Sequence, residues 1–439
     1  MKRSLSLVVC LFGSISLAFG LDTLWTGERL PPLVRMVRAY GGNDERLPPI
    51  LVVSSQGSQG ISALGSSSLT VELDVASSVP PDLVAVLQHC TAEWDADPNP
   101  FVLDPTASRA VVLDWQLAPP QSRYYTYRAK LRIPSTTLKV PVGGNWKVLF
   151  FEIGSERRPL AEARFFAIEP AADCRLDVFT DFYQPRRNAA PSARILEAVV
   201  SNVREYTDGQ VTTAVFYRMQ RWSQPYRASG TRLASGSSLS LRTTPTLTSG
   251  MVGGIKRFRI EGLPCENDYR RLDVQNVGLF PRSTTPVRLP LADVRRRGQF
   301  GLWSTPEAAL ITSDVSPLDD EYVPIEFILD PEGVPVRDED VFVVGSMNGW
   351  QPTRDWMMSY DSTQRLYRLR QWVRRGQHAY MYGTGTLDAD TGTVRNLSFE
   401  EFEGNNSASG QTFLALIYAR SLNAGGYDTI IAACSSAAL

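Results

Sequence analysis

The 439-residue sequence is poor in histidine, the side chain that enzymes use most often for acid–base chemistry. It contains only two histidines, His89 and His378, although histidine is the residue that titrates near neutral pH. His89 adjoins Cys90, but neighbouring residues of a strand point to opposite faces, so the two cannot form a catalytic pair there. No third group is placed to orient either ring. We therefore predict structural or surface roles for both histidines.

The short motifs of common active sites are also missing: there is no G-x-S-x-G elbow, phosphate-binding loop or H-E-x-x-H zinc helix. Asp388–Gly392 has the acidic spacing with which a calcium loop begins, but Gly392 stands where such a loop has an oxygen ligand. We predict a hairpin turn there instead. These absences predict a protein that is not an enzyme and has no catalytic, metal or cofactor site. Paired carboxylates brought together by the fold would leave no trace in the sequence.

Long hydrophobic runs are missing beyond the N-terminus. Two basic residues, an apolar stretch over 5–19 and a small residue at Gly20 together have the pattern of a signal peptide, residues 1–20. We predict cleavage between Gly20 and Leu21 and export to the periplasm. The alternative is a lipid on Cys10, but Val9 stands where a lipobox has Gly or Ala. No later run reaches the roughly 18 apolar residues of a membrane-spanning helix, so we predict no transmembrane segment.

Net charge is nearly absent. The 45 Lys and Arg against 46 Asp and Glu leave a net charge of -1, which argues against nucleic acid or an anionic membrane as the main partner. The densest basic run consists of Arg295, Arg296 and Arg297. We interpret it as solvated surface, with contact to a partner as the alternative.

Cysteines are few and far apart. After signal cleavage four remain, Cys90, Cys174, Cys265 and Cys434, and they lack the spacing of a metal site. In an oxidising compartment they can form disulfides with three full connectivities, and each equally suits a small buried hydrophobic position. We predict at most one bridge.

Short segments with apolar residues at period two are abundant. Such segments run over residues 69–74, 146–151, 211–219, 325–328 and 341–344. Turn signals at intervals of about 8–12 residues predict stacked β-sandwiches. The apolar run 83–87 follows two prolines and fits either a helix or a buried strand, of which we favour the strand.

Two connectors rich in proline and acidic residues, near 168–173 and 304–320, divide the chain. The predicted fold is all-β, with three consecutive immunoglobulin-like or E-set β-sandwich domains. Their predicted limits are 21–170, 171–316 and 317–439.

One segment of the third domain has a distinctive turn. Gly345 ends a predicted strand, Asn348-Gly349 makes a tight turn, and Trp350 folds back over the sheet. The segment resembles the G-D-F-N-x-W signature of E-set, glycogen-binding-like sandwiches. Sugar-binding members of that class add a Lys and a second Trp, but Met381 stands at the Lys position and no Trp follows it. We predict that Trp350 packs in the core or an interface, with carbohydrate stacking as the alternative.

An ordered set of short motifs covers about residues 65–432. The motifs lie at Leu87–Trp94, Tyr124–Arg128, Gly144–Trp146, Gly253–Arg259, Phe402–Asn406, Leu416–Arg420 and Gly426–Asp428. In this order they resemble the plug protein family of the type IX secretion system. The Asn-Ala-Gly insertion before Tyr427 departs from the family pattern.

The resemblance implies a non-catalytic periplasmic plug that docks on and seals the periplasmic opening of the large outer-membrane translocon barrel. It implies no nucleic acid and no small-molecule substrate. Tyrosine and arginine are typical of protein contacts, so candidate partner contacts are Tyr124, Tyr125, Tyr127 and the run 295–297. For the tyrosines, cross-strand packing is the other interpretation. The alternative function is a periplasmic or surface carbohydrate-binding β-sandwich protein.

Overall fold

The computed structural model describes residues 31–53, 64–182, 192–207, 209–229, 246–248, 255–301, 304–305, 308–333, 335–336 and 338–436. The chain from Pro32 to Leu439 forms one compact unit. The predicted signal peptide, its Gly20–Leu21 cleavage site, Cys10 and the Gly253-Gly254 pair lie outside the described residues.

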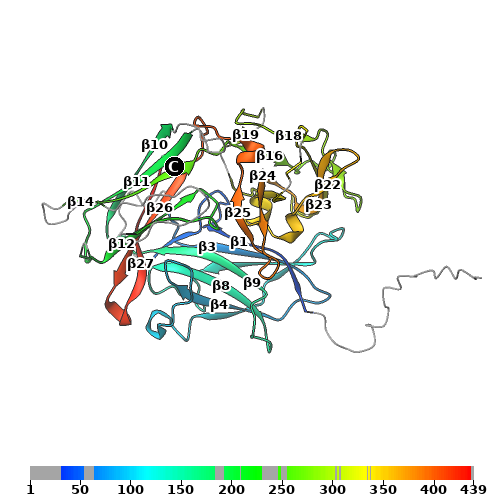
Figure 1. Cartoon of the computed structure of the whole chain (residues 1–439). Coiled ribbons are helices and arrows are strands. Elements are labelled where there is room, and N and C mark those ends of the chain that lie inside the picture. The colour runs from blue at the N-terminus through cyan, green and yellow to red at the C-terminus, as the bar shows by residue number, and fades with distance from the viewer. Residues whose placement is uncertain are drawn as a thin grey trace, which may run out of the picture. The chain divides into compact units, whose positions relative to one another are not determined.

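The described chain is all-β, as predicted (Figure 1). The run 83–87 is part of a strand rather than a helix. The helices of the described residues are α1 (Glu400–Glu403) and the 3-10 turns η2 (Pro100–Val102), η3 (Ser346–Asn348), η4 (Arg354–Trp356) and η5 (Asn423–Gly425). None of these described helices has the length and apolarity to cross a membrane.

The N-terminal region is a sandwich of two sheets. One sheet has the order β1 (Leu33–Gly41), β3 (Leu69–Ala76), β7 (Tyr127–Ile133) and β6 (Trp115–Leu117). The facing strands are β9 (Ala161–Ile168), β8 (Gly144–Glu152), β4 (Leu83–Cys90) and β5 (Arg109–Val112), with β2 (Ile50–Val52) parallel to β9. Leu69, Val71, Leu73 and Val75 alternate along β3 and enter the core between the sheets, as the period of two requires.

The facing sheet continues through distant strands. Beyond β9 it runs through β27 (Tyr427–Ser435), β26 (Phe413–Ser421), β12 (Val211–Arg218) and β13 (Tyr226–Ser229), which makes nine strands with β2. A second core separates this half from the sheet β10 (Asp173–Phe182), β11 (Ser192–Ser201), β15 (Ile255–Pro264) and β14 (Thr246–Thr248).

The third pair of sheets encloses its own core. One sheet contains β19 (Ser304–Thr305), β16 (Tyr269–Asp273), β24 (Gln377–Leu387), β21 (Asp340–Gly345) and β25 (Val394–Ser398). The other contains β17 (Val287–Arg288), β18 (Asp293–Val294), β20 (Tyr322–Asp330), β23 (Leu366–Arg374) and β22 (Ser359–Asp361). Asp388–Gly392 forms the predicted hairpin turn between β24 and β25.

Strand pairing crosses the predicted domain limits. Strands β26 and β27 fall within 317–439, yet they pair with β12 and β9 from the two preceding segments. The three-domain division stays a prediction.

A disulfide reinforces this long-range pairing. Cys174 of β10 is bonded to Cys434 of β27, while Cys90 and Cys265 are free and buried. One bridge agrees with the prediction of at most one.

The disulfide provides a stability prediction. It joins residues 260 positions apart, so it strongly restricts the unfolded chain. Replacing both Cys174 and Cys434 with serine should lower the free energy of unfolding by about 2–4 kcal/mol. Chemical denaturation without reductant measures this loss. Reductant should destabilise the wild type and leave the double variant unchanged; equal sensitivity of the two proteins would contradict the assignment.

Candidate functional site

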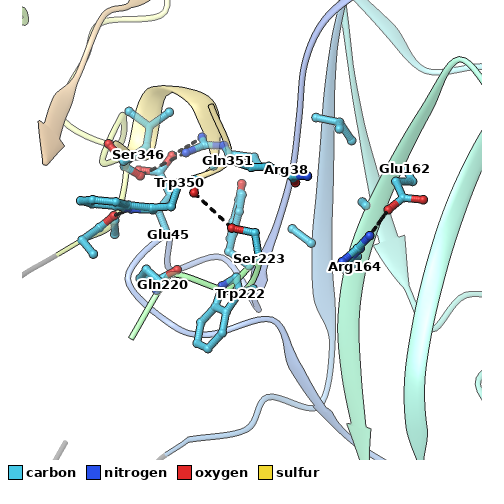
Figure 2. A pocket seen from close by; sticks show the side chains of 18 residues that line it. Arg38, Glu45, Glu162, Arg164, Gln220, Trp222, Ser223, Ser346, Trp350 and Gln351 are labelled. Carbon is cyan, nitrogen blue, oxygen red and sulfur yellow. Dashed lines mark hydrogen bonds and ion pairs between the residues drawn. The ribbon is translucent and has the colours of Figure 1, made fainter. Parts of the chain in front are cut away.

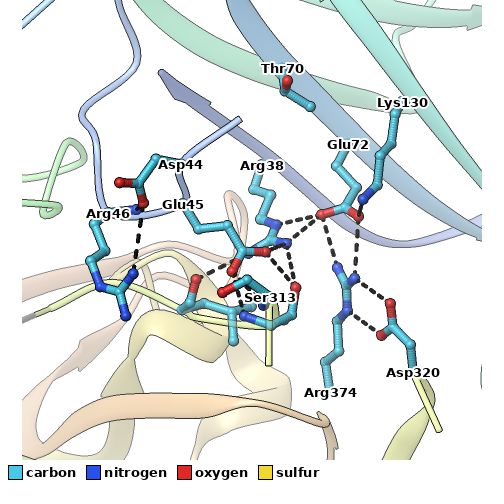
Figure 3. A network of polar contacts seen from close by, with 12 residues as sticks. Arg38, Asp44, Glu45, Arg46, Thr70, Glu72, Lys130, Ser313, Asp320 and Arg374 are labelled. Atoms are coloured by element: carbon cyan, nitrogen blue, oxygen red, sulfur yellow. Dashed lines mark hydrogen bonds and ion pairs between the residues drawn. The ribbon is translucent and has the colours of Figure 1, made fainter. Parts of the chain in front are cut away.

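A buried network of charges joins the N-terminal sandwich to the third pair of sheets. At its centre, Glu72 of β3 has a fully buried side chain and accepts from Arg374, at the end of β23, at 3.0 and 3.2 Å. Arg38 of β1 donates to the same carboxylate at 2.6 Å, and Arg374 also donates to Asp320 at 2.9 Å with both Nε and Nη2. Figure 3 shows Glu72 between the two guanidinium groups.

A second carboxylate of the same strand extends the network. Asp74 accepts from Arg128 of β7 at 2.5 and 2.9 Å, and from the hydroxyl of Tyr322 on β20 at 2.8 Å. Arg128 reaches across to Asp320 as well. The polar face of β3 is therefore buried against β20 and β23 rather than solvated. Because each charge is paired, this network holds the N-terminal sandwich and the third pair of sheets in one orientation.

The arginines determine the ionisation of these carboxyls. Burial by itself would raise the pKa of Glu72, but Arg374, Arg38 and Arg128 outweigh it and hold the pKa well below the ordinary 4.5. For Asp320, burial is likewise outweighed by Arg374 and Arg128, and the pKa lies below 3.8. Both groups are thus ionised at neutral pH.

The lowered pKa of Glu72 makes the stability of the folded protein depend on pH. A carboxyl with a lowered pKa in the folded state stabilises the protein above its unfolded pKa, and this contribution is lost as pH falls. Glu72→Gln should therefore be less stable than the wild type at pH 7, and the difference should narrow as pH falls below 4.5, the ordinary glutamate pKa. Urea denaturation of both proteins from pH 7 to 3 measures the difference. A difference that stays constant or widens toward pH 3 would contradict the network.

The three candidate tyrosines lie in internal contacts. Tyr125 is 2% exposed and its hydroxyl donates to the Asp320 carbonyl at 2.6 Å. Tyr124 stacks on Trp372 of β23 with ring centroids 5.3 Å apart. Tyr127 packs edge-on to Trp115 of the paired strand β6, which is the predicted cross-strand packing. The partner-contact interpretation is wrong for Tyr125, because the third pair of sheets covers that side chain.

The arginine run is less solvated than predicted. Arg296 is 8% exposed and donates to the Asp268 carbonyl at 2.5 Å. Arg295 pairs with Glu401 at 2.8 Å and its side chain is 17% exposed. The interpretation as solvated surface, or as a partner contact, is therefore wrong for Arg296, and Arg297 alone of the run has an open side chain, 65% exposed. The sequence did not indicate this burial, because the partners of Arg295 and Arg296 are distant in the chain.

Trp350 is a packing residue, as predicted. It is 1% exposed, its indole N–H donates to the Ala308 carbonyl at 2.9 Å, and its ring lies 4.7 Å from that of Tyr269. The buried guanidinium of Arg221, from the turn after β12, lies 5.2 Å from its ring centroid and 4.8 Å from that of Phe399. Trp350 thus joins the third pair of sheets to the nine-stranded sheet.

Both histidines are buried in structural contacts, so the structural alternative of the prediction is confirmed and the surface alternative is wrong. His89 lies 2.9 Å from Asp97 and 3.2 Å from the Gly143 carbonyl. His378 lies 2.7 Å from the Arg374 carbonyl, which can only accept, so its Nε2 carries the proton and Nδ1 accepts from the Ser346 hydroxyl at 3.2 Å.

This Ser–His contact is a poor catalytic pair. Burial lowers the pKa of His378 to about 4, and the backbone N–H of Ala379 already donates to the Ser346 oxygen. The pair therefore orders the turn that carries Trp350. Among the described residues, no cluster of His, Cys, Asp or Glu is arranged to hold a metal ion.

A cleft of about 210 Å³ opens beside the charge network. Figure 2 shows its three sides: Glu162 and Arg164 of β9, the turn with Trp222 and Ser223, and the turn with Ser346 and Trp350. Four consecutive residues of β1, 37–40, complete the lining. No sequence motif indicated this site, because its residues meet only in the fold.

Comparison with known proteins identifies a fold and no family. No protein-family model matches the chain, and neither does any curated protein sequence. Among solved structures, a hypothetical protein from Parabacteroides merdae matches with a TM-score of 0.67 at 15% identity, over 92% of this chain and 96% of that one. A bacterial ice-binding adhesin covers 93% and 98% with a TM-score of 0.16 at 9% identity, which supports no argument. The chain is thus an all-β, multi-sheet protein whose fold recurs in the Parabacteroides protein.

Proposed function

We propose that this protein is a non-catalytic periplasmic plug, which docks on and seals the periplasmic opening of the large outer-membrane barrel of a type IX secretion system. The ordered motifs between about residues 65 and 432 carry this proposal. The predicted signal peptide supports export, and a near-neutral net charge of -1 fits a protein partner.

The contacts that join distant segments of the molecule support the same role. A cover over a wide pore must resist deformation, and a string of loosely linked sandwiches would not. Here the buried charges around Glu72, the Trp350–Arg221 contact and the Cys174–Cys434 disulfide join segments that are distant in the sequence. Such contacts favour a single rigid body over independent domains.

The carbohydrate-binding alternative rests on Trp350. Stacking against a sugar needs an exposed aromatic face, and this side chain is 1% exposed. This observation favours the plug over the alternative.

Deleting the gene tests the proposed role in the cell. A strain that lacks the plug but makes the barrel should admit large antibiotics that ordinary porins exclude, because the wide pore is uncovered. A strain that lacks both plug and barrel should regain its barrier. Unchanged permeability in the single deletion, with the barrel at its normal level, would show that this protein does not seal the channel.

A further inference from the structure

Two turns that are distant in the sequence touch each other, and each carries a large exposed apolar side chain. Phe101, in η2 of the loop between β4 and β5, is 74% exposed. Leu422, in the turn between β26 and β27 (red in Figure 1), is 75% exposed. The Asn99 side chain joins the turns, because it donates to the Ala424 carbonyl at 2.6 Å and to the Gly426 carbonyl at 3.2 Å.

These two turns, residues 98–103 and 421–426, are here called the apolar tip. Its backbone has a defined shape. Gly425 has a φ of 84°, and a Cβ atom added there would lie 3.5 Å from Phe101 Cδ2, so the glycine backbone lies against the ring. Ala424 has a φ of 46°, a region that residues with a Cβ atom rarely adopt. A preformed surface of this kind loses little conformational entropy when it binds.

The apolar tip contains no charged residue, although charged residues make up 21% of the chain. Its segments read Pro-Asn-Pro-Phe-Val-Leu and Ser-Leu-Asn-Ala-Gly-Gly. The charged residues that flank the two segments each have a partner: Arg420 with Asp428, Asp104 with Lys139, and Asp97 with His89. The base of the tip therefore combines charges of both signs and has no excess of cations.

The polar backbone groups of the tip have partners within it. Pro98 and Pro100 have no N–H to hydrate. The Phe101 N–H donates to Asn99 Oδ1 at 3.0 Å, and the Gly426 N–H donates to the Asn423 carbonyl at 2.9 Å. Polar groups that already have partners can leave water at little cost, whereas unpaired ones cannot.

We propose that the apolar tip inserts into the surface of a phospholipid bilayer, with Phe101 and Leu422 at the boundary between headgroups and acyl chains. Exposed Phe and Leu side chains are typical of segments that lie in this boundary. A protein partner would be recognised through a polar rim with hydrogen bonds, and the tip has few free groups for them. Without an excess of cations the tip should bind zwitterionic lipid as well as anionic lipid.

This membrane contact is separate from the proposed docking on the barrel and does not depend on it. The turn that carries Leu422 contains the Asn-Ala-Gly insertion, in which this chain departs from the plug family pattern. The resemblance to that family therefore does not imply the contact.

Flotation of the mature protein with phosphatidylcholine vesicles tests the proposal. One acyl chain of fourteen carbons binds at about 0.1 mM lipid, and two side chains bury less apolar surface, so half of the wild type should be bound at about 1 mM lipid. Higher salt, or partial replacement of the lipid with phosphatidylglycerol, should change the bound fraction less than about twofold.

Variants of the tip locate the contact. Phe101→Ser and Leu422→Ser should each lower the partition coefficient about tenfold and leave the thermal unfolding midpoint unchanged, because both side chains are exposed. Leu422→Trp should bind more tightly than the wild type. Leu113→Ser is the matched control: Leu113 is 77% exposed and follows β5 beside the start of β4, whereas Phe101 lies in the loop that follows the end of β4.

Three results would overturn the proposal. The first is no binding of the wild type to phosphatidylcholine at about 10 mM lipid, tenfold above the expected midpoint. The second is binding that needs phosphatidylglycerol and is lost in high salt, which would indicate a cationic surface elsewhere. The third is an equal loss of binding in Leu113→Ser and Phe101→Ser. If the wild type ignores vesicles but Phe101→Ser recovers less of a protein partner from membrane extracts, the tip is a protein contact instead.

Discussion

Replacing Arg374 with methionine should lower the free energy of unfolding by about 3–5 kcal/mol, because removing one partner of a buried ion pair leaves an uncompensated charge. The Arg374 side chain is 1% exposed, and it donates hydrogen bonds to both Glu72 and Asp320, whereas Arg128 donates to Asp320 and lies 3.6 Å from Glu72. Its loss leaves Glu72 with Arg38 as its hydrogen-bond donor and removes one positive charge from the buried group of carboxylates. Urea denaturation at pH 7 measures the effect.

Arg370 provides a matched control on the same strand. Its side chain is 68% exposed and pairs with Glu326 at 3.2 Å. Exposed ion pairs contribute about 0–1 kcal/mol, so Arg370→Met should have little effect. If Arg374→Met lowered the free energy of unfolding no more than Arg370→Met, the network would not hold the N-terminal sandwich and the third pair of sheets together.

Trp350→Ala is expected to have an effect of similar size, about 3–5 kcal/mol, because it empties a buried aromatic site. The change also removes the ring that lies under Arg221 and beside Tyr269. Thermal and chemical denaturation should both report the loss.

Trp350→Phe separates packing from hydrogen bonding. It keeps an aromatic ring but leaves the Ala308 carbonyl without its donor, so it should cost about 1–3 kcal/mol, less than the alanine variant. A Trp350→Ala protein that kept full stability and lost binding to a glucan would overturn the packing role and favour a carbohydrate-binding protein.

The strands were predictable because burial imposes a period of two. The alternation of Leu69, Val71 and Leu73 with polar residues indicates a half-buried strand without reference to the rest of the chain. The same signal placed strand β4 correctly where a helix was the alternative. The role of Trp350 also followed locally, from a tight turn that returns the chain to the sheet.

The long-range contacts were not predictable in this way. Polarity at Glu72 suits a solvated face and a buried ion pair equally well, and its partner Arg374 lies 302 residues away. Burial of Tyr125 and Arg296 depends on distant segments in the same manner. The pairing of β26 with β12 joins segments with no local sequence signal for it. The cleft is lined by residues from several segments that are distant in the sequence, so no local pattern indicates it.

The central claim is that this protein covers a secretion barrel, and isolating the native complex tests it most directly. An affinity-tagged chain, expressed at its natural level and recovered from solubilised outer membranes, should bring a very large β-barrel protein with it in a fixed ratio. The Arg374→Met variant, if the rigid body matters for docking, should recover less of that barrel than Arg370→Met at equal expression. Recovery of the tagged chain alone, from membranes in which the barrel is present at its normal level, would contradict the account.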